Sequence, residues 1–445
     1  MKYIKQPMNM KSHNYIFILV MSAWALLTFS MSSCGGDDDT PPEPAVPPVT
    51  VAVNPATVSL PATGGSQTIT VTLTNATDWS ASSDATWLTV TKTGATSLRL
   101  EAEMNTGNAR NATVRCTAGT ATASVSVSQP ALSATQSDSL ALVDLYNATA
   151  GANWTIRWTF SGPLSQWQGV KVEDGRVTEL YLPANNLTGT LPESIGTLSR
   201  LQYCDLRENH LSGSVPATVS RWTQLVYLDL SDNQFSGAFP AIQALTKLIV
   251  LDGSFNTFTS LPALNSLTAL EYLAFSKNSL SGSLPANWSS LTGLIYVDVS
   301  FNTFSGNIPA EWATLSRLQA FYLYKNTLSG ALPDYLGNCT NLESMALDGN
   351  NLTGAIPATF GTQPQLAELW LAQNRLTGAI PASLLSNAHW SEWKSEVCPQ
   401  QSGYGFDNCT GGDPPSDKPS LSSAIQRLSY KEKYWRKHNG SRRPF

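Results

Sequence analysis

One asparagine recurs at nearly constant spacing between residues 185 and 374. Its copies lie 22 to 24 residues apart, each is followed two residues later by Leu or Phe, and each is followed six or seven residues later by proline. The nine copies are Asn185, Asn209, Asn233, Asn256, Asn278, Asn302, Asn326, Asn350 and Asn374. A unit repeated nine times at this period predicts a stack of similar turns, because each turn can bury its apolar side chains only against its neighbours.

The six residues before each asparagine predict one short strand per turn. Side chains alternate along a strand, so residues five and three before the asparagine, such as Leu228 and Leu230, are expected to face the core. Residues six, four and two before it are expected to face outward. The asparagine amide both donates and accepts, so stacked copies predict a ladder that satisfies backbone groups at the turns.

The repeat resembles the plant-type, 24-residue class of leucine-rich repeats, on segments such as 182–192 (LPANNLTGTLP) and 347–357 (LDGNNLTGAIP). The resemblance implies a solenoid with a parallel concave sheet. It places an N-terminal cap over 131–176, nine repeats over 177–386 and a C-terminal cap over 387–410. Plant caps carry a cysteine pair that this N-terminal cap lacks, so its tryptophans are expected to hold it by packing.

The region before the repeats predicts a separate small domain. Residues 51–130 alternate apolar and polar side chains with period two, as in 68–73 (TITVTL), which is typical of half-buried strands. The run from Asp78-Trp79 through Trp87 to Glu101–Gly107 resembles the BACON domain, known from Bacteroidetes surface proteins, often ahead of glycan-active modules. The expected fold class is therefore mainly β: a small immunoglobulin-like β-sandwich followed by a leucine-rich-repeat solenoid. Trp79 and Trp87 are expected in the sandwich core, with sugar stacking as the alternative.

The N-terminus predicts export. Three lysines precede an apolar run over 15–29, and small residues precede Cys34. Residues 1–33 resemble a bacterial lipoprotein signal peptide, which implies a lipid on Cys34; an ordinary secretory signal is the alternative. Residues 34–50 predict an acidic, proline-rich tether. Its Asp37–Asp39 run resembles a surface-export signal, so we expect an outer-membrane lipoprotein exposed on the cell surface.

The outward positions of the repeats predict a binding face. They combine a stripe of aromatic side chains with a row of aspartates, and aromatic residues on a solvated face are typical of binding hot spots. The predicted ligand-binding residues are Tyr203, Asp205, Tyr227, Asp229, Asp252, Tyr272, Tyr296, Asp298, Tyr322, Tyr324 and Trp370. The alternatives are that the tyrosines only pack against one another and that Arg207 balances the acids. A row of like charges favours a basic protein partner or Ca²⁺.

Two features mark the end and the middle of the array. Cys398 and Cys409 favour a disulfide in an oxidising compartment, and residues 411–445 predict a flexible basic tail. Between Asn233 and Asn278 the spacing shortens and one turn glycine is missing, so local curvature is expected to change.

Net charge and motif content narrow the class of function. The net charge of −5 argues against nucleic-acid binding, and no catalytic motif stands in a fitting context, so no enzyme and no cofactor is predicted beyond the Ca²⁺ named above. The leading prediction is a lipid-anchored receptor or adhesin whose concave face binds an extracellular or host protein. The rivals are a glycan-binding module and a structural coat protein without a specific ligand.

Overall fold

The computed structural model describes residues 47–409 of the 445-residue chain. The predicted signal peptide, Cys34, the Asp37–Asp39 run and the basic tail lie outside the described residues. Within 47–409, no helix is both long enough and apolar enough to cross a membrane.

The N-terminal domain is a sandwich of two four-stranded sheets, ordered β1-β3-β6-β5 and β2-β8-β7-β4. The strands are β1 (Thr50–Asn54), β2 (Thr57–Ser59), β3 (Gly65–Thr74), β4 (Ser80–Ser83), β5 (Leu88–Lys92), β6 (Ser97–Ala102), β7 (Arg110–Ala118) and β8 (Ala121–Gln129). Alternate residues such as Ile69 and Val114 are fully buried between the sheets, as the period-two pattern predicts. Trp79 is in this core, and its indole donates to the Ala95 carbonyl. Trp87 is half-buried beneath the Arg110 guanidinium, which lies 4.5 Å from the ring centre.

Helix α1 (Ala134–Ala148) opens the N-terminal cap of the solenoid. Ser133 and Gln136 form a capping box at its start, which satisfies two backbone donors of the first turn. From this helix the buried Asp138 makes a bidentate ion pair with Arg176, with both contacts at 2.9 Å. The helical turns η1 (Gly151–Asn153) and η2 (Leu164–Gln166) follow. Tyr146 and three buried tryptophans, Trp154, Trp158 and Trp167, pack together there in place of the cysteine pair.

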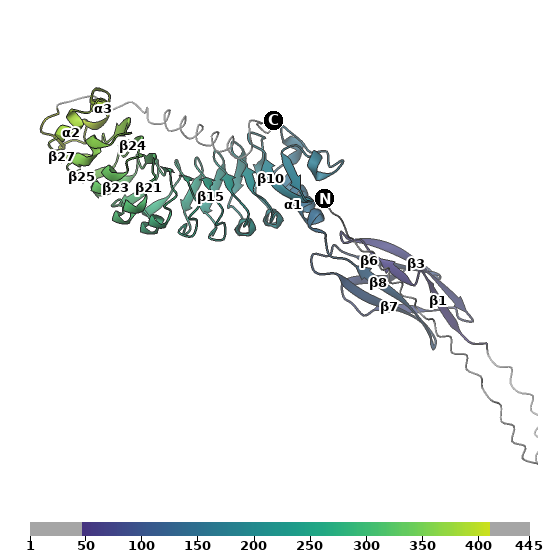
Figure 1. Ribbon diagram of the computed structural model, residues 1–445. Coiled ribbons are helices and arrows are strands. Elements are labelled where there is room, and N and C mark those ends of the chain that lie inside the picture. Colours follow the sequence, from purple (N-terminus) through teal and green to yellow (C-terminus); the bar gives the residue numbers. More distant parts are fainter. Residues whose placement is uncertain (1–46, 410–445) are drawn as a thin grey trace, which may run out of the picture.

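The repeats build a ten-stranded sheet, ordered β9-β10-β12-β14-β16-β18-β20-β22-β24-β26. Its strands are β9 (Val170–Glu173), β10 (Arg176–Tyr181), β12 (Tyr203–Asp205), β14 (Tyr227–Asp229), β16 (Val250–Asp252), β18 (Tyr272–Ala274), β20 (Tyr296–Asp298), β22 (Ala320–Tyr322), β24 (Ser344–Ala346) and β26 (Glu368–Trp370). From β10 onward the strands pair in parallel, so the expected solenoid with a parallel sheet is confirmed (Figure 1). The inward residues, such as Leu228 and Cys204, are fully buried in one continuous core.

The asparagine ladder runs along this stack. The side-chain amide of Asn302 donates to the carbonyls of Phe275, Val299 and Ser300 at 2.9–3.1 Å, and its oxygen accepts from the Leu280 N–H at 2.9 Å. The same pattern recurs at Asn256 and Asn326. Each asparagine therefore joins its own turn to the turn before it.

The opposite side of the solenoid is built from shorter strands and helical turns. The strands are β11 (Thr188–Gly189), β13 (His210–Gly213), β15 (Gln234–Ala238), β17 (Thr257–Ser260), β19 (Ser281–Ser283), β21 (Thr303–Gly306), β23 (Thr327–Ala331), β25 (Asn351–Gly354), β27 (Arg375–Gly378) and β28 (Gly405–Phe406). The turns are η3 (Glu193–Thr197), η4 (Ala217–Arg221), η5 (Ala286–Ser290), η6 (Ala310–Thr314), η7 (Asp334–Asn338) and η8 (Ala358–Thr362). These strands form two sheets, one ending at β17 and the other starting at β19.

The break between the two sheets coincides with the shortened repeats. Eight repeats carry a glycine with positive φ four residues after the asparagine, for example Gly282 at 88°. In the short repeat Ser260 takes that place without a positive φ, and the pairing of β15 with β17 shifts register. The sequence irregularity therefore interrupts the outer sheet and leaves the concave sheet continuous.

Helices α2 (Ala382–Leu385) and α3 (Trp390–Val397) close the far end, where Cys398 and Cys409 form a disulfide. Trp393 is buried and its indole donates to the Ala367 carbonyl at 2.9 Å. Gln400 takes the place of a tenth ladder asparagine: its oxygen accepts from the Leu376 N–H, and its amide donates to the Leu371 and Val397 carbonyls.

A candidate binding face on the concave sheet

The parallel register brings ten of the eleven predicted residues into two rows across the concave sheet; Tyr324 lies just beyond β22 and meets Phe301 edge-on at 5.2 Å. Tyr203 pairs with Tyr227, and Tyr272 with Tyr296, with Val250 between the two pairs. The second row aligns Asp205, Asp229 and Asp252 on adjacent strands and continues through Ala274 to Asp298, Tyr322 and Trp370. Because one residue separates the two rows on every strand, both face the same side of the sheet.

The tyrosines of the first row stack in pairs. The rings of Tyr203 and Tyr227 are stacked with centres 4.2 Å apart, and those of Tyr272 and Tyr296 with centres 4.4 Å apart. Tyr322 meets Tyr296 edge-on at 5.6 Å. Parallel strands about 4.8 Å apart hold identical side chains at this stacking distance.

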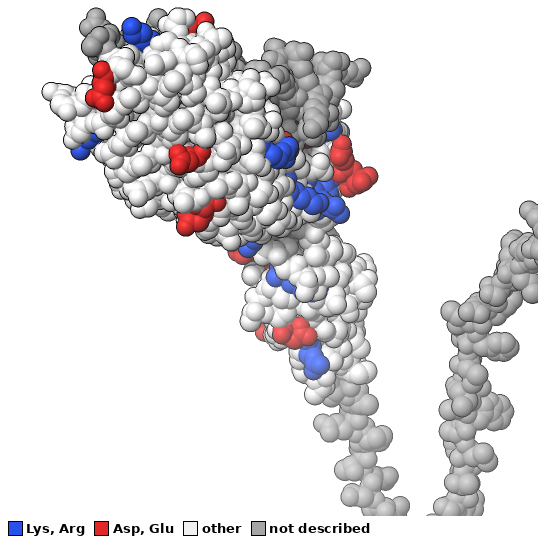
Figure 2. Space-filling view, turned by 60° about the vertical axis from the view of Figure 1, so that its left-hand side comes forward, with Lys and Arg blue, Asp and Glu red and all other residues white. Residues whose placement is uncertain are grey.

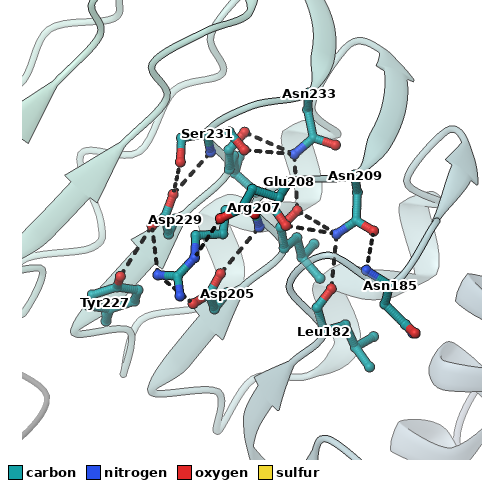
Figure 3. A network of polar contacts seen from close by, with 12 residues as sticks. Leu182, Asn185, Asp205, Arg207, Glu208, Asn209, Tyr227, Asp229, Ser231 and Asn233 are labelled. Carbon is teal, nitrogen blue, oxygen red and sulfur yellow. Dashed lines mark hydrogen bonds and ion pairs between the residues drawn. The ribbon is translucent and has the colours of Figure 1, made fainter. Parts of the chain in front are cut away.

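Backbone and basic groups hold the aspartates (Figure 3). The Arg207 guanidinium lies 3.2 Å from a carboxylate oxygen of Asp205 and 3.7 Å from one of Asp229. Asp229 also accepts from the Ser231 N–H and hydroxyl and from the Tyr227 hydroxyl. Asp298 accepts in the same way from Ser300. The Asp-x-Ser pattern therefore fixes the carboxylates of Asp229, Asp252 and Asp298 to their own strand ends, and at Asp205 the Arg207 N–H donates in the same way.

The expected exposure of this face is wrong. The predicted residues are buried, with 0–7 % of their surface exposed, and only Trp370 is half-buried. The buried residues are Tyr203, Asp205, Tyr227, Asp229, Asp252, Tyr272, Tyr296, Asp298, Tyr322 and Tyr324. The apolar members form a second buried cluster, separate from the solenoid core. Stacking of like side chains across strands covers the faces of the rings, which accounts for part of this burial; the ligand-binding role of these residues stays a prediction.

Burial and charge shift the ionisation of this face. Burial, followed by the charges of Asp205 and Asp229, raises the pKa of Tyr203 well above its usual value. Burial likewise raises the pKa of Tyr227, with Asp229 next in importance. Although burial opposes its charge, Arg207 has a raised pKa because of the same two aspartates. The tyrosines are therefore neutral hydrogen-bonding groups and the arginine a permanent cation.

A rim of left-handed residues borders the two rows. The residue directly before each ladder asparagine has positive φ in all nine repeats, among them Glu208 at 56°, Phe255 at 55° and Lys277 at 52°. Glu208 and Phe255 are exposed, and the Lys277 ammonium lies 4.5 Å from the Phe255 ring centre and 5.3 Å from that of Phe301. The sequence prediction missed this rim. The one residue-type signal for a positive φ is Gly349, which stands directly before the ladder asparagine of the eighth repeat.

Two further candidate sites can be assessed from the described residues. Across 47–409, no group of three His, Cys, Asp or Glu side chains is arranged to hold a metal ion, so we do not propose Ca²⁺ at the acidic row. A cavity of about 610 Å³ lies on the outer face of the sandwich, over β2, β7 and β8, and is lined by small and polar side chains such as Asn111 and Thr113. Its described lining contains no aromatic ring on which a sugar could stack.

The charged groups of the solenoid are sparse on the face seen in Figure 2.

Comparison with known families agrees with the geometry. Residues 180–383 match the model of the leucine-rich repeat region, and residues 50–132 match that of the viral BACON domain. The chain combines an N-terminal BACON-like domain with a leucine-rich repeat domain. A probable inactive receptor kinase of Arabidopsis thaliana is 38 % identical over 86 residues, which is 19 % of this chain and 13 % of that protein.

Solved structures similar to the chain include receptor ectodomains. The leucine-rich repeat ectodomain of the plant membrane receptor kinase GASSHO1/SCHENGEN3 from Arabidopsis thaliana, in complex with CASPARIAN STRIP INTEGRITY FACTOR 2, is 30 % identical with a TM-score of 0.53. This match covers 59 % of our chain and 32 % of that one. The Arabidopsis receptor kinase HAESA is 32 % identical with a TM-score of 0.44, covering 52 % of this chain and 47 % of that one. The chain thus spans about a third to a half of the length of these structures.

Proposed function

We propose that the repeat domain is a non-catalytic binding module that takes an extracellular protein or peptide ligand on its concave face. The observation that carries this proposal is the register of the concave sheet, which aligns tyrosines and aspartates into adjacent rows. Aromatic side chains beside hydrogen-bonded charges are the composition of protein-binding hot spots. The likeness to a receptor ectodomain solved in complex with another protein supports the same class of function.

The proposed ligand carries basic and aromatic groups. Carboxylates dominate the half of the face around β12 to β16, where Asp205, Asp229 and Asp252 adjoin Glu208 and Asp232. Complementary charge speeds encounter and rejects acidic partners. The exposed Phe255 and the half-buried Trp370 supply apolar surface at the edge of the same face.

Anchoring and location complete the proposal. The lipoprotein-like segment before Cys34 supports a lipid-anchored protein at the outer membrane, displayed on the cell surface, with the BACON-like domain as a spacer. Replacing Cys34 with Ala is expected to release the protein from the membrane fraction. A variant that stays membrane-bound would contradict the lipid anchor.

The experiment for ligand class is a screen of the mature chain against an array of host extracellular proteins and an array of glycans. Glu208→Lys reverses an exposed charge on the rim, and Glu311→Lys makes the same change on the exposed turn η6, outside the concave sheet. We expect protein binding that Glu208→Lys weakens at least tenfold and Glu311→Lys leaves unchanged. Glycan binding alone, or equal effects of the two variants, would overturn the proposal.

A further inference from the structure

The outward face of the concave sheet is closed to solvent. Side chains on one face of a single sheet pack sideways against their cross-strand neighbours, which covers the flat sides of the rings and leaves their outer edges. Yet Tyr227, Tyr272 and Tyr322 expose at most 1 % of their surface, and Asp229 and Asp252 expose none. Stacking within the sheet does not account for burial as complete as this.

We propose that residues 410–445 of the same chain dock on the concave face and occupy the binding site as a built-in competitor. The inference rests on the proposed function, and it adds both a regulatory element and a chemical class of ligand, a basic-aromatic peptide. Charge, side-chain composition and reach each support this occupant.

Charge favours this segment over the rest of the chain. Residues 410–445 contain eight Lys and Arg against three Asp and Glu, a formal net charge of +5. The whole chain has a net charge of −5, so residues 1–409 have a net charge of −10. Residues 410–445 therefore carry the positive charge that complements the acidic row and its rim. The attraction between such surfaces is strongest where water is excluded.

The side chains of the segment suit an aromatic face. Its central run, 430–437, reads Tyr-Lys-Glu-Lys-Tyr-Trp-Arg-Lys, which interleaves three aromatic rings with four cations. Aromatic rings can pack edge-on against the stacked tyrosines, and cations can lie beside the carboxylates two residues along each strand. Phe255 and Phe301 already hold the Lys277 ammonium in this manner at the rim.

Residues 410–445 are also long enough to reach the acidic half of the sheet. It starts directly after Cys409, which the disulfide to Cys398 fixes at the far cap, next to β26 and β27. At about 4.8 Å per strand, the sheet from β26 to β10 measures roughly 38 Å. A 36-residue chain spans up to roughly 120 Å when extended, and about 54 Å even at the rise of a helix. The basic run can therefore reach the acidic half of the sheet from its attachment point.

The first test asks whether residues 410–445 stay bound to the solenoid after the folded mature protein is cleaved between them. A protease site is introduced within 411–416, and the cleaved protein is passed over a sizing column in 50 mM and in 1 M NaCl. We expect the released fragment to stay with the solenoid at low salt and to separate at high salt. A fragment that separates at 50 mM NaCl would overturn the proposal.

A labelled synthetic peptide of residues 418–445 then measures binding to the cleaved, salt-washed protein. The matched control peptide carries Lys431→Glu, Lys433→Glu, Arg436→Glu and Lys437→Glu, and is expected to bind at least tenfold more weakly. Equal binding of the two peptides would overturn the charge argument. If the uncleaved chain is a dimer only when residues 410–445 are present, the segment serves a second copy and docking within one chain is wrong.

The outcomes separate this proposal from the function proposed above. A fragment that dissociates freely, together with array binding that Glu208→Lys weakens, would leave the receptor function standing without the built-in competitor. A fragment that docks while no array protein binds before or after cleavage would support the docking and contradict the receptor function.

Discussion

At the residue scale, Arg207 occupies the most consequential position on the concave face. Its guanidinium contacts the carboxylates of Asp205 and Asp229, whose side chains have no exposed surface, while its own side chain is 25 % exposed. Burial of a charge without compensation costs several kcal/mol, so this cation stabilises two buried carboxylates at once.

Replacing Arg207 with Met is therefore expected to lower the free energy of unfolding by about 2–4 kcal/mol, because two buried carboxylates lose a compensating charge. Arg317→Met is the matched control, since Arg317 is half-exposed and lies 3.9 Å from Glu271; we expect a loss within about 0.5 kcal/mol. Urea unfolding measures both. If Asp229→Asn added to Arg207→Met restores none of the lost stability, the assignment of the loss to buried charge is wrong.

The buried tyrosines predict an alkaline limit to stability. The pKa values of Tyr203, Tyr227 and Tyr322 are raised above 10 in the fold, chiefly by burial. Above pH 10 the unfolded chain releases phenolic protons that the folded chain retains, so rising pH favours unfolding. The free energy of unfolding is expected to receive this contribution in full below pH 10 and to fall above it. Urea titrations at several pH values, with phenolate absorbance as a second probe, measure the effect; a folded protein in which every tyrosine titrates with a midpoint near pH 10 would contradict it.

At the element scale, the asparagine ladder gives each turn its link to the next. Asn302 makes four hydrogen bonds to backbone groups of two successive turns, and its oxygen is the acceptor for the buried Leu280 N–H. Asn302→Ala is expected to cost about 2–4 kcal/mol, because the buried Leu280 N–H loses its acceptor and the carbonyls of Phe275, Val299 and Ser300 each lose one of two donors. Asn287→Ala, at an exposed position of η5, is the control and is expected to be close to neutral. Equal losses in urea unfolding would show that the ladder contributes nothing specific.

The same elements show what the sequence could and could not predict. The asparagine spacing predicted the strands, their register and the ladder, because each repeat presents the same side chains at the same turn. It could not predict that Tyr227 and Asp229 are buried, because alternation tells which side a residue faces and not what covers that side. The left-handed conformation of Glu208 and Phe255 carries no residue-type signal, and Gln400 replaces an asparagine outside the repeat spacing.

At the scale of the whole molecule, the two domains have separate cores. No residue of the described sandwich core belongs to the solenoid core, and a short segment after Gln129 leads from β8 to α1. A core that shares no side chains with its neighbour unfolds as its own cooperative unit. The BACON-like domain is therefore expected to unfold independently of the repeat domain, as the proposed spacer role requires.

Calorimetry of the mature chain is accordingly expected to show two transitions. Val114→Ala, in the sandwich core, should lower only one midpoint, and Leu273→Ala, in the solenoid core, only the other, since both side chains are fully buried. A Leu→Ala change of this kind costs about 2–5 kcal/mol, enough to move a midpoint by several degrees. Because each turn contacts only its neighbours, a weakened turn lets the parts of the array on either side unfold separately, so the solenoid transition should also broaden. A single transition that both variants shift equally would mean that the two cores are coupled and that the sandwich is part of the binding module.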